Sequence, residues 1–325
     1  MKDISKYLVS NLKGKKIFLT GGTGLLGKWL LEVLRETEAT LVLLTRNPES
    51  FCRNFPAVNS MPVTFVSGDV RDFVFPEGYF DYCIHAATPV LSGNQWSSSS
   101  QLSSIIIDGT KRVLEFAESA GLQRLVYVSS GAVYGHQPSD SERLNETFPC
   151  NPFTPYGKGK LIAEELCLES KIDCIVGRCF AFVGPHLPYD AHFAIGNFIG
   201  NCLRGEPILI EGDGSAIRSY MYGSDLAEWL LIMLLSDLKN EIFNIGSDHA
   251  ISIYDLAYFV RKTLSRKNPI VFARKKTNSI KNSSRYIPSI DKARGKLDLK
   301  LKVELKDSIL KTVLINEANS GKLRF

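Results

Sequence analysis

The sequence lacks the features that mark several broad classes of protein. Its seven cysteines include no Cys-x-x-Cys pair, which argues against a zinc site and against a disulfide framework. No apolar run is long enough to cross a membrane, and the N-terminus lacks the order of a signal peptide. We therefore expect a protein of the reducing cytoplasm that uses neither a metal nor a membrane.

An excess of charge of one sign is also missing. The 325 residues carry 39 basic and 34 acidic side chains, which gives a formal net charge of +5. The basic clusters, at 13–16 and 274–276, are short, so the sequence does not predict a nucleic-acid interface. Hydrophobic residues make up 44% of the chain and charged residues 22%, as is ordinary for a globular protein.

What the sequence does have is an alternation of short apolar strands with helices. The pattern predicts helices at 29–34, 105–120 and 156–168, and strands at 16–20, 41–44, 63–66, 82–85, 125–128 and 174–176. These strands are continuously apolar, which is typical of a parallel sheet covered on both faces. We expect an α/β fold, a doubly wound parallel sheet of the Rossmann type with a smaller mixed α/β C-terminal substrate-binding part.

The alternation loosens after about Gly184, where glycine and proline become frequent. A helix at 225–235 and a strand at 242–244 still fit the main sheet. We therefore assign 1–180 to the Rossmann domain, with 221–250 returning to it. Residues 181–220 and 251–325 are expected to form a substrate-binding cap.

A glycine-rich segment follows the first strand and opens the first helix. It reads Gly21-Gly22-Thr23-Gly24-Leu25-Leu26-Gly27. Glycines allow a tight turn and a close approach of the backbone to a pyrophosphate, which the positive end of the helix then holds. The sequence thus predicts a dinucleotide site in which the cofactor contacts are Gly21, Thr23, Gly24, Leu25, Leu26 and Gly27.

The second strand bears on which dinucleotide is bound. An acidic residue at its end would bind the ribose 2′-hydroxyl of NAD, but the chain has Thr45-Arg46-Asn47 there. A guanidinium suits a 2′-phosphate, so Arg46 favours NADP as the cofactor, with NAD as the alternative. Arg46 could instead stack on the adenine or point into solvent.

Tyr156 and Lys160 are four residues apart on one predicted helix, which places them on one face. Ser129 and Ser130 follow the fifth strand, at the sheet edge where such folds bind ligands. A nearby ammonium stabilises a phenolate, so Tyr156 could exchange a proton with a substrate oxygen that Ser130 also holds. The sequence therefore predicts Tyr156, Lys160 and Ser130 as catalytic residues.

These motifs resemble those of the extended short-chain dehydrogenase/reductases, the group of nucleotide-sugar epimerases, dehydratases and reductases. The resemblance covers nearly the whole chain. It rests on the glycine loop, Gly68-Asp69-Val70-Arg71-Asp72, His85-Ala86-Ala87, Ser129-Ser130-Gly131-Ala132-Val133-Tyr134-Gly135, Tyr156-Gly157-Lys158-Gly159-Lys160, Gly184-Pro185, Gly212-Asp213-Gly214, Arg218 and Asn244-Ile245-Gly246.

The resemblance implies further site residues and a partner. The cofactor would contact Asp69 and Val70 at the adenine, Ala86 and Ala87 along its length, and Ser129, Tyr156 and Lys160 near the nicotinamide. The substrate, a nucleotide-diphosphate sugar, would contact Ser130, Tyr156, Asn197 and Arg218. The resemblance also implies a homodimer, to which the helices at 105–120 and 156–168 could contribute.

Departures from the family pattern narrow the reaction. Dehydratases of the group carry an Asp-Glu pair just after the position of Ser130, and decarboxylases carry a glutamate at position 132. This chain has Gly131 and Ala132 there, which carry no acid. The family also often has asparagine where Ile106 and Ala181 stand.

Two main hypotheses follow. The first is an NADP-dependent reductase of a nucleotide-linked 4-keto-6-deoxy sugar, similar to the dTDP-4-dehydro-6-deoxyglucose reductases of surface polysaccharide or deoxysugar biosynthesis. The second is an NAD(P)-dependent nucleotide-sugar 4-epimerase. A 4,6-dehydratase and a redox-inert protein that binds NADP or a nucleotide sugar rank lower. The dehydratase lacks its acids, and a redox-inert protein would often have lost Tyr156 or Lys160.

Overall fold

The computed structural model describes residues 4–88, 100–191, 193–273 and 284–319. The predicted basic cluster at 274–276 lies outside these residues. The core is a seven-stranded sheet in the order β11-β6-β5-β4-β1-β2-β3, with every neighbouring pair parallel. Its strands are β1 (Lys16–Thr20), β2 (Thr40–Thr45), β3 (Val63–Ser67), β4 (Tyr82–His85), β5 (Arg124–Ser130), β6 (Cys174–Cys179) and β11 (Glu241–Ile245).

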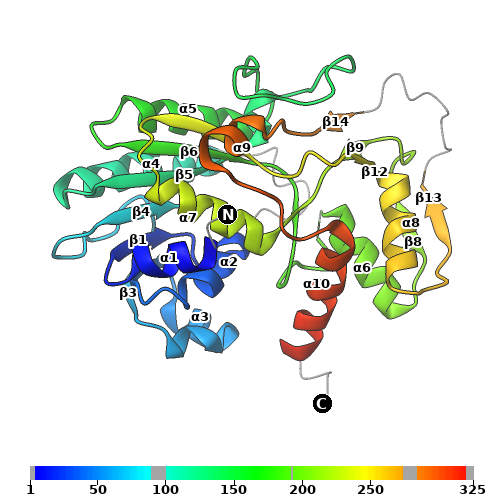
Figure 1. Cartoon of the computed structure of the whole chain (residues 1–325), viewed down its shortest axis with the longest axis horizontal. Helices are drawn as coiled ribbons and strands as arrows, with labels where there is room; N and C mark the ends of the chain where they lie inside the picture. The colour runs from blue at the N-terminus through cyan, green and yellow to red at the C-terminus, as the bar shows by residue number, and fades with distance from the viewer. Residues whose placement is uncertain (1–3, 89–99, 192, 274–283, 320–325) are drawn as a thin grey trace.

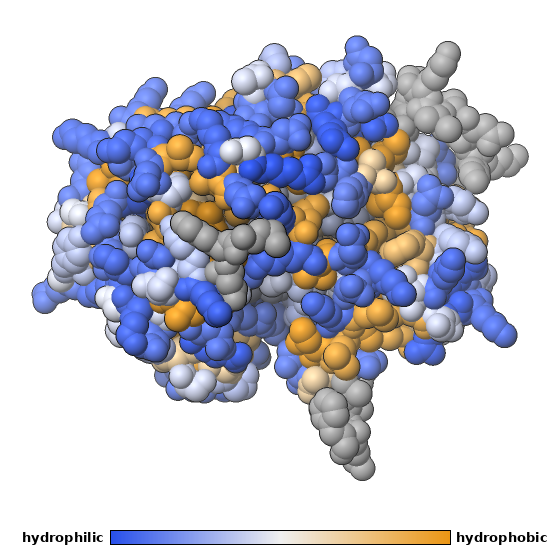
Figure 2. Space-filling view, viewed as in Figure 1, coloured by the Kyte–Doolittle hydropathy of each residue, from blue (hydrophilic) through white to orange (hydrophobic). Residues whose placement is uncertain are grey.

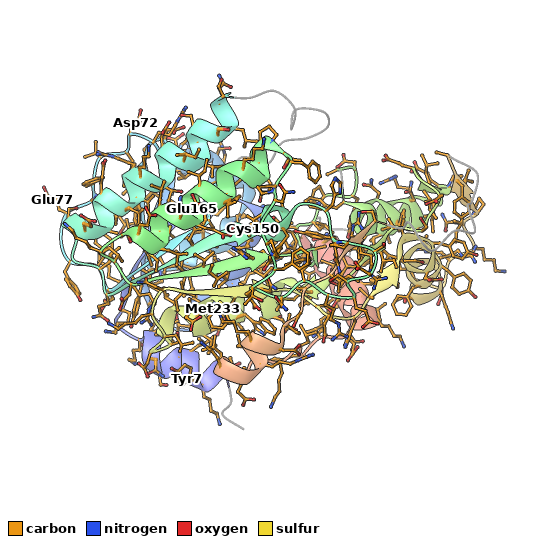
Figure 3. All side chains as sticks on the ribbon, turned by 90° about the horizontal axis from the view of Figure 1, so that it is seen from above. Tyr7, Asp72, Glu77, Cys150, Glu165 and Met233 are labelled. Carbon is orange, nitrogen blue, oxygen red and sulfur yellow. The ribbon has the colours of Figure 1, made fainter. Side chains whose placement is uncertain are left out.

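Helices cover both faces of this sheet. One face carries α1 (Ile4–Leu12), α2 (Leu25–Leu34), α3 (Pro48–Asn54) and α7 (Gly223–Leu235), and the other carries α4 (Ser100–Ser119) and α5 (Pro155–Glu169). Figure 3 shows Met233 of α7 and Glu165 of α5 on opposite sides of the strands. The predicted doubly wound α/β fold is confirmed.

Alternate residues of each strand supply the two cores. In β1, Ile17 and Leu19 pack with α1, α2 and α7, whereas Phe18 packs with α4. Phe18 lies 4.5 Å from Phe116 between ring centroids. Both faces of the inner strands are buried, so these strands read as continuous apolar runs in the sequence, whereas the edge strand β3 contains no buried residue.

The second part of the molecule lies to the right of the main sheet in Figure 1. Its elements are β7 (Phe182–Val183), α6 (Ala194–Arg204), β8 (Ile208–Ile210), β9 (Ile217–Arg218), β10 (Met221–Tyr222), β12 (Ile251–Ser252), α8 (Ile253–Thr263), β13 (Ile270–Phe272), β14 (Arg285–Tyr286) and α10 (Leu305–Asn319). The helix α9 (Asp291–Leu297) instead packs against the main sheet beside β11. Its short strands form small sheets, β12-β9-β14, β13-β8 and β10-β7. A separate apolar core joins α6 to α8 and α10.

Trp29 of α2 connects the two parts. Its indole Nε1 donates to the carbonyl oxygen of Pro185 at 2.9 Å. A Cβ at Gly184 would lie 2.8 Å from the indole ring, and one at Gly223 would lie 2.3 Å from it. Glycine is therefore required at both positions, and the Gly184-Pro185 segment is held against α2.

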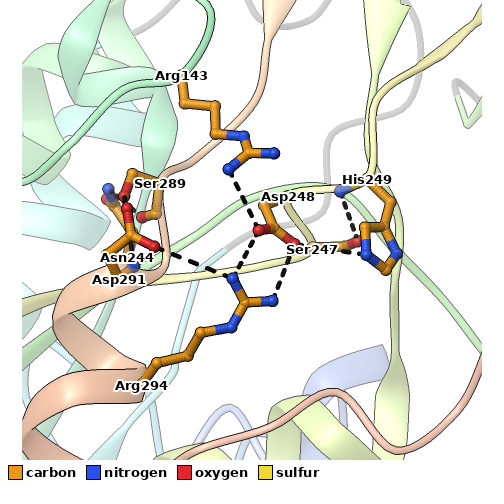
Figure 4. Close-up of polar contacts among 8 residues, drawn as sticks. All are labelled: Arg143, Asn244, Ser247, Asp248, His249, Ser289, Asp291 and Arg294. Carbon is orange, nitrogen blue, oxygen red and sulfur yellow. Dashed lines mark hydrogen bonds and ion pairs between the residues drawn. The ribbon is translucent and has the colours of Figure 1, made fainter.

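A polar cluster fixes α9 and the loop before α5 to the end of β11 (Figure 4). Arg294 donates to both carboxylate oxygens of Asp248, at 2.7 and 3.2 Å, and Arg143 lies 3.4 Å from the same carboxylate. Burial acts to raise the pKa of Asp248, but Arg294 and Arg143 together lower it by more. The pKa of Asp248 therefore lies below its usual range. The segment that leads from β14 to α9 is thus anchored to the main sheet.

Among the described residues, none of the helices combines the length and the apolar character that a membrane span requires. No three His, Cys, Asp or Glu side chains within the same ranges lie close enough together to hold a metal ion. Figure 2 shows hydrophobic residues at the surface over α10, a helix on which Leu310 and Leu314 are 40% and 54% exposed. The homodimer and the domain division stay predictions.

Candidate active site

The glycine loop lies at the carboxyl end of β1, where the sheet order reverses between β1 and β4. Gly21 adopts a φ of +72°, and a Cβ there would lie 2.4 Å from the backbone of Ala86. A Cβ on Gly27 would lie 2.3 Å from the Cα of Gly22. The first glycine therefore brings the turn against the end of β4, and the last lets the start of α2 pack against the backbone of Gly21 and Gly22.

The residues of this turn fit a dinucleotide. Gly24 is the N-cap of α2, and no side chain caps the helix. A Cβ added at Gly24 would meet only the carbonyl oxygen of Gly21, at 3.3 Å. The N–H groups of the first turn of a helix have no partner within the helix and suit a phosphate. Of the predicted cofactor contacts, Gly21, Thr23 and Gly24 lie in this turn, and Leu25, Leu26 and Gly27 lie in the first turn of α2.

His85, at the end of β4, forms a rigid base under the loop. Its imidazole lies 2.7 Å from Thr20 Oγ1 and 3.0 Å from Thr110 Oγ1. Burial lowers the pKa of His85 to about 3, with a further contribution from the charge of Lys160. The neutral ring holds Thr20, whose hydroxyl accepts from the backbone N–H of Ala87 at 3.2 Å. Ala86 and Ala87 are thereby fixed beside the glycine loop.

Tyr156 and Lys160 stand on the same face of α5, against the end of β5. The Lys160 Nζ donates to the carbonyl oxygen of Val128 at 2.7 Å and lies 6.0 Å from the ring centroid of Tyr156. The Ser130 side chain lies near enough to the Tyr156 phenol to lower its pKa. Thr154 caps α5 by accepting from Gly157 N at 3.1 Å, which fixes the start of the helix. The structure thus brings together the three residues that the sequence predicts as catalytic.

Burial dominates the acid–base properties of this pair. It raises the pKa of Tyr156 to about 12, although the neighbouring Ser130 side chain acts to lower this pKa. It lowers the pKa of Lys160 to about 8, although Cys179 and Glu164 raise it. A positive charge near Tyr156 would stabilise its phenolate and return its pKa toward the working range.

A buried ion pair stands behind these residues. Glu164, one turn after Lys160, accepts from Arg178 of β6 at 2.7 Å and from the Ser129 hydroxyl at 2.5 Å. Both charged side chains are almost fully buried, at 2% and 4% exposed. The pair ties α5 to β5 and β6. Because the Ser129 hydroxyl is bonded to Glu164, a cofactor contact of Ser129 would have to come from its backbone.

The residues predicted to surround the adenosine lie at the ends of β2 and β3. Arg46 is exposed just after β2. Asp69 accepts from Arg71 Nε at 2.7 Å, and this hydrogen bond lowers the pKa of its carboxyl. Val70 is buried against Gly109 of α4, where a Cβ would lie 2.7 Å from the valine. Arg46 and Asp69 are close enough to interact electrostatically.

The two residues predicted to approach the substrate diphosphate come from the second part. The side-chain oxygen of Asn197, on α6, is buried without a hydrogen-bond partner among the described residues. Arg218, on β9, donates to the carbonyl oxygens of Ile217 and Ser284, at 2.8 and 2.9 Å. Burial lowers the pKa of Arg218. An unpaired polar atom and a desolvated guanidinium suit a polar, anionic ligand.

A family model for NAD-dependent epimerases and dehydratases matches residues 17–246, from β1 to the end of β11. The chain belongs to the NAD-dependent epimerase/dehydratase family. This confirms the resemblance on which the site residues were assigned. It also shows an enzyme family in which redox chemistry takes part.

Members of this family resemble the chain over most of its length. The dTDP-D-glucose 4,6-dehydratase of Mus musculus is 25% identical over 92% of this chain and 88% of its own. The UDP-glucuronic acid decarboxylase 6 of Arabidopsis thaliana is 26% identical over 94% of this chain and 89% of its own.

Solved structures of the family share the fold. An epimerase from Methanothermobacter thermautotrophicus has a TM-score of 0.83 at 24% identity, and the match covers 98% of this chain and 97% of that one. The UDP-glucose 4-epimerase of Thermotoga maritima, solved with UDP-glucose, has a TM-score of 0.78 at 22% identity over 94% of this chain and 99% of that one.

Several residues of the family site were not predicted from the sequence. Cys179 and Phe180, at the end of β6, and Tyr286 of β14 border Ser130 and Tyr156. The sequence does contain an indication of Glu164 and Arg178. Glu164 is a carboxylate four residues after Lys160, and Arg178 is the one charged residue in an apolar strand. The sequence gives no indication of Tyr286, because this residue lies in a two-residue strand without a periodic pattern.

Proposed function

We propose that the protein is an NADP-dependent reductase of a nucleotide-linked 4-keto-6-deoxy sugar. The observation that carries this proposal is the proximity of Ser130 to Tyr156 above a glycine loop, without a carboxyl side chain at positions 131 and 132. This set of groups can transfer a proton to a sugar oxygen, but it lacks the acids that water elimination requires.

The chain's own residues have distinct roles in this proposal. Ser130 holds the substrate oxygen by a hydrogen bond, and Tyr156 gives it a proton. Lys160, held by the carbonyl of Val128, keeps a positive charge near the phenol. Asn197 and Arg218 bind the diphosphate and so fix the sugar against these groups. A nicotinamide dinucleotide, held by the glycine loop, supplies the hydride.

The groups that surround Gly131 support reduction over dehydration. A Cβ at Gly131 would lie 2.7 Å from the Phe180 ring and from the Tyr286 hydroxyl, so the space of an acidic side chain is already filled. Relatives named as dehydratases and decarboxylases share about a quarter of their residues with the chain, which does not fix the reaction.

Turnover tests this proposal directly. Purified protein is incubated with NADPH or NADH and a series of dTDP- and UDP-linked 4-keto-6-deoxy sugars. We expect oxidation of NADPH with at least one of them, and loss of turnover by at least a hundredfold in Tyr156→Phe. The absence of cofactor oxidation with the whole series would reject the reductase.

The choice of cofactor rests on Arg46 and has its own test. We expect Arg46→Ala to raise the KM for NADPH about tenfold and to leave the KM for NADH unchanged, because the guanidinium would bind only the 2′-phosphate. Arg35→Ala, an exposed arginine paired with Glu36, serves as the control. Equal effects of Arg46→Ala on both cofactors would remove the basis for NADP.

A second candidate is a nucleotide-sugar 4-epimerase that uses NAD or NADP. It is favoured by the match to a family of NAD-dependent epimerases and dehydratases, and by the similarity of the fold to solved epimerases. An epimerase regenerates its cofactor, so it would release bound dinucleotide on denaturation and interconvert UDP-sugars without added NADPH. If mass spectrometry finds neither NAD nor NADP released from the denatured protein, that result would count against the epimerase.

A further inference from the structure

A chain of buried hydrogen bonds connects α4 to the end of β4. Thr110 Oγ1 donates to the carbonyl oxygen of Ile106 at 2.6 Å and lies 3.0 Å from Nε2 of His85. On the other side of this ring, Nδ1 lies 2.7 Å from Thr20 Oγ1, which accepts from the N–H of Ala87 at 3.2 Å. The side chains of Thr20, His85 and Thr110 are at most 1% exposed, so these bonds are shielded from bulk water.

The donors and acceptors along this chain have one consistent order. A threonine hydroxyl has a single proton, and that of Thr110 is used on the carbonyl oxygen of Ile106. Thr110 can therefore only accept from His85, so the proton of the neutral ring is on Nε2. Nδ1 is then an acceptor, and it takes the proton of Thr20. The lone pairs of Thr20 Oγ1 remain for the N–H of Ala87.

The other tautomer of the ring would break this chain. With the proton on Nδ1, the lone pair of Nε2 would face a lone pair of Thr110 Oγ1 at 3.0 Å. The proton of Thr20 would also lose its acceptor in the chain. Unpaired polar groups are costly in a buried site. Thr110 thus selects the tautomer of His85, and that tautomer orients the hydroxyl of Thr20.

The chain ends on the backbone that borders the glycine loop. Thr20 holds two successive N–H groups there, that of Ala86 with its carbonyl oxygen at 3.2 Å and that of Ala87 with its hydroxyl. A Cβ at Gly21 would lie 2.4 Å from the carbonyl carbon of Ala86. The loop therefore turns directly against this backbone, and a shift of Ala86 and Ala87 would alter the space beside the loop.

We propose that Thr110 is a positioning residue of the dinucleotide site: it selects the tautomer of His85 that orients the hydroxyl of Thr20. That hydroxyl holds Ala87 beside the glycine loop. The inference rests on the proposed function, in that a dinucleotide binds at this loop. Because the chain acts through the backbone of Ala87 and not through the 2′-phosphate, its effect is the same for NADPH and NADH.

NMR tests the hydrogen-bond chain without any ligand. In protein with 15N-labelled histidine, assigned with His85→Gln, we expect His85 to be a single neutral tautomer with its proton on Nε2. The Nε2–H signal should move upfield in Thr110→Val, which removes the acceptor, and change far less in Thr110→Ser, which keeps it. A wild-type ring protonated on Nδ1 would overturn the proposal, whether or not the variants fold.

Titration of NADPH and of NADH tests the consequence for the cofactor. We expect Thr110→Val to raise both Kd values about fivefold, as the loss of one hydrogen bond would, and Thr110→Ser to stay within about twofold of the wild type. The control is Thr312→Val. Thr312 is equally buried and donates to the carbonyl oxygen of Ser308 at 2.6 Å, four residues back in α10. Its replacement should leave both Kd values unchanged.

A double variant separates positioning from a general loss of stability. Thr20→Val removes the hydroxyl on the far side of the ring, so Thr110→Val should raise Kd no further in that background, although it should still lower Tm. A further rise in Kd there, an unchanged Kd in Thr110→Val alone, or the same rise in Thr312→Val would each overturn the proposal. A wild type that binds neither dinucleotide would reject the proposed function, and the NMR measurement would still decide the chain.

Discussion

The two candidate residues on α5 are buried, and burial moves their pKa values in opposite directions. Lys160 titrates near pH 8 and Tyr156 near pH 12 in the protein alone. Below pH about 8 the lysine is an ammonium, and it then favours a phenolate beside it. Above that pH the ammonium loses its proton and this stabilisation disappears.

The pKa of Lys160 predicts how kcat/KM changes with pH on the basic side, or basic limb, of its pH profile. We expect kcat/KM of the wild type to fall above pH about 8, as Lys160 loses its proton. Lys160→Arg keeps a positive charge at all accessible pH values. Its activity should be lower, but the limb should move to higher pH, whereas Lys160→Met should be inactive. An unchanged limb in Lys160→Arg would show that another group titrates there.

At the scale of elements, the ion pair of Glu164 and Arg178 connects α5 to β6. Although burial lowers it, the hydrogen bonds to Glu164 raise the pKa of Arg178 overall. Removal of one partner leaves the other charge buried without compensation, which costs about 3 to 5 kcal/mol. Replacement of both by apolar residues removes that penalty.

The pair therefore predicts a non-additive cycle. Glu164→Leu and Arg178→Met should each lower the free energy of unfolding by about 3 to 5 kcal/mol, and the double variant should lose less than the sum. Urea unfolding of the four proteins measures this. Additive losses would mean that the two side chains stabilise the protein independently.

The elements also show how far the sequence could be interpreted. The inner strands of the main sheet were predicted because both of their faces are buried, as at Phe18 and Leu19 of β1. Helix α4 begins at Ser100, before the predicted 105, because its first turn carries few apolar residues. The strands of the second part have only two or three residues, too few for a periodic pattern, so Tyr286 could not be placed.

The site was predicted in the same uneven way. Residues that follow a strand of the main sheet, such as Gly21 and Ser130, lie at its carboxyl edge by the geometry of parallel strands. Cys179 and Phe180 also follow this rule, but neither carries a motif. The hydroxyl of Ser129 bonds with Glu164, which spacing alone could not indicate.

At the scale of the whole molecule, folding buries a neutral histidine next to the glycine loop. The pKa of His85 is about 3 in the folded protein, whereas that of an exposed histidine is about 6.5. Between these values the unfolded chain binds a proton that the folded chain does not. Stability contributed by His85 is therefore fully present above pH 6.5 and is lost as the pH falls below it.

We expect the free energy of unfolding to fall by about 2 kcal/mol between pH 6.5 and pH 5 through this histidine. Urea unfolding at the two values measures it. His85→Gln should be less stable at pH 6.5, because contacts with Thr20 and Thr110 are lost, but its dependence on pH should be weaker. The same pH dependence in both proteins would contradict this assignment.

The central claim is that Tyr156 and Lys160 act on a nucleotide sugar beside a dinucleotide held by the glycine loop. The most direct test follows the nicotinamide absorbance of bound cofactor after rapid mixing with the nucleotide sugar. We predict a change in the wild type and none in Tyr156→Phe, with equal cofactor binding in both. A change of the same rate in Tyr156→Phe, or a wild type that binds no dinucleotide, would contradict the account.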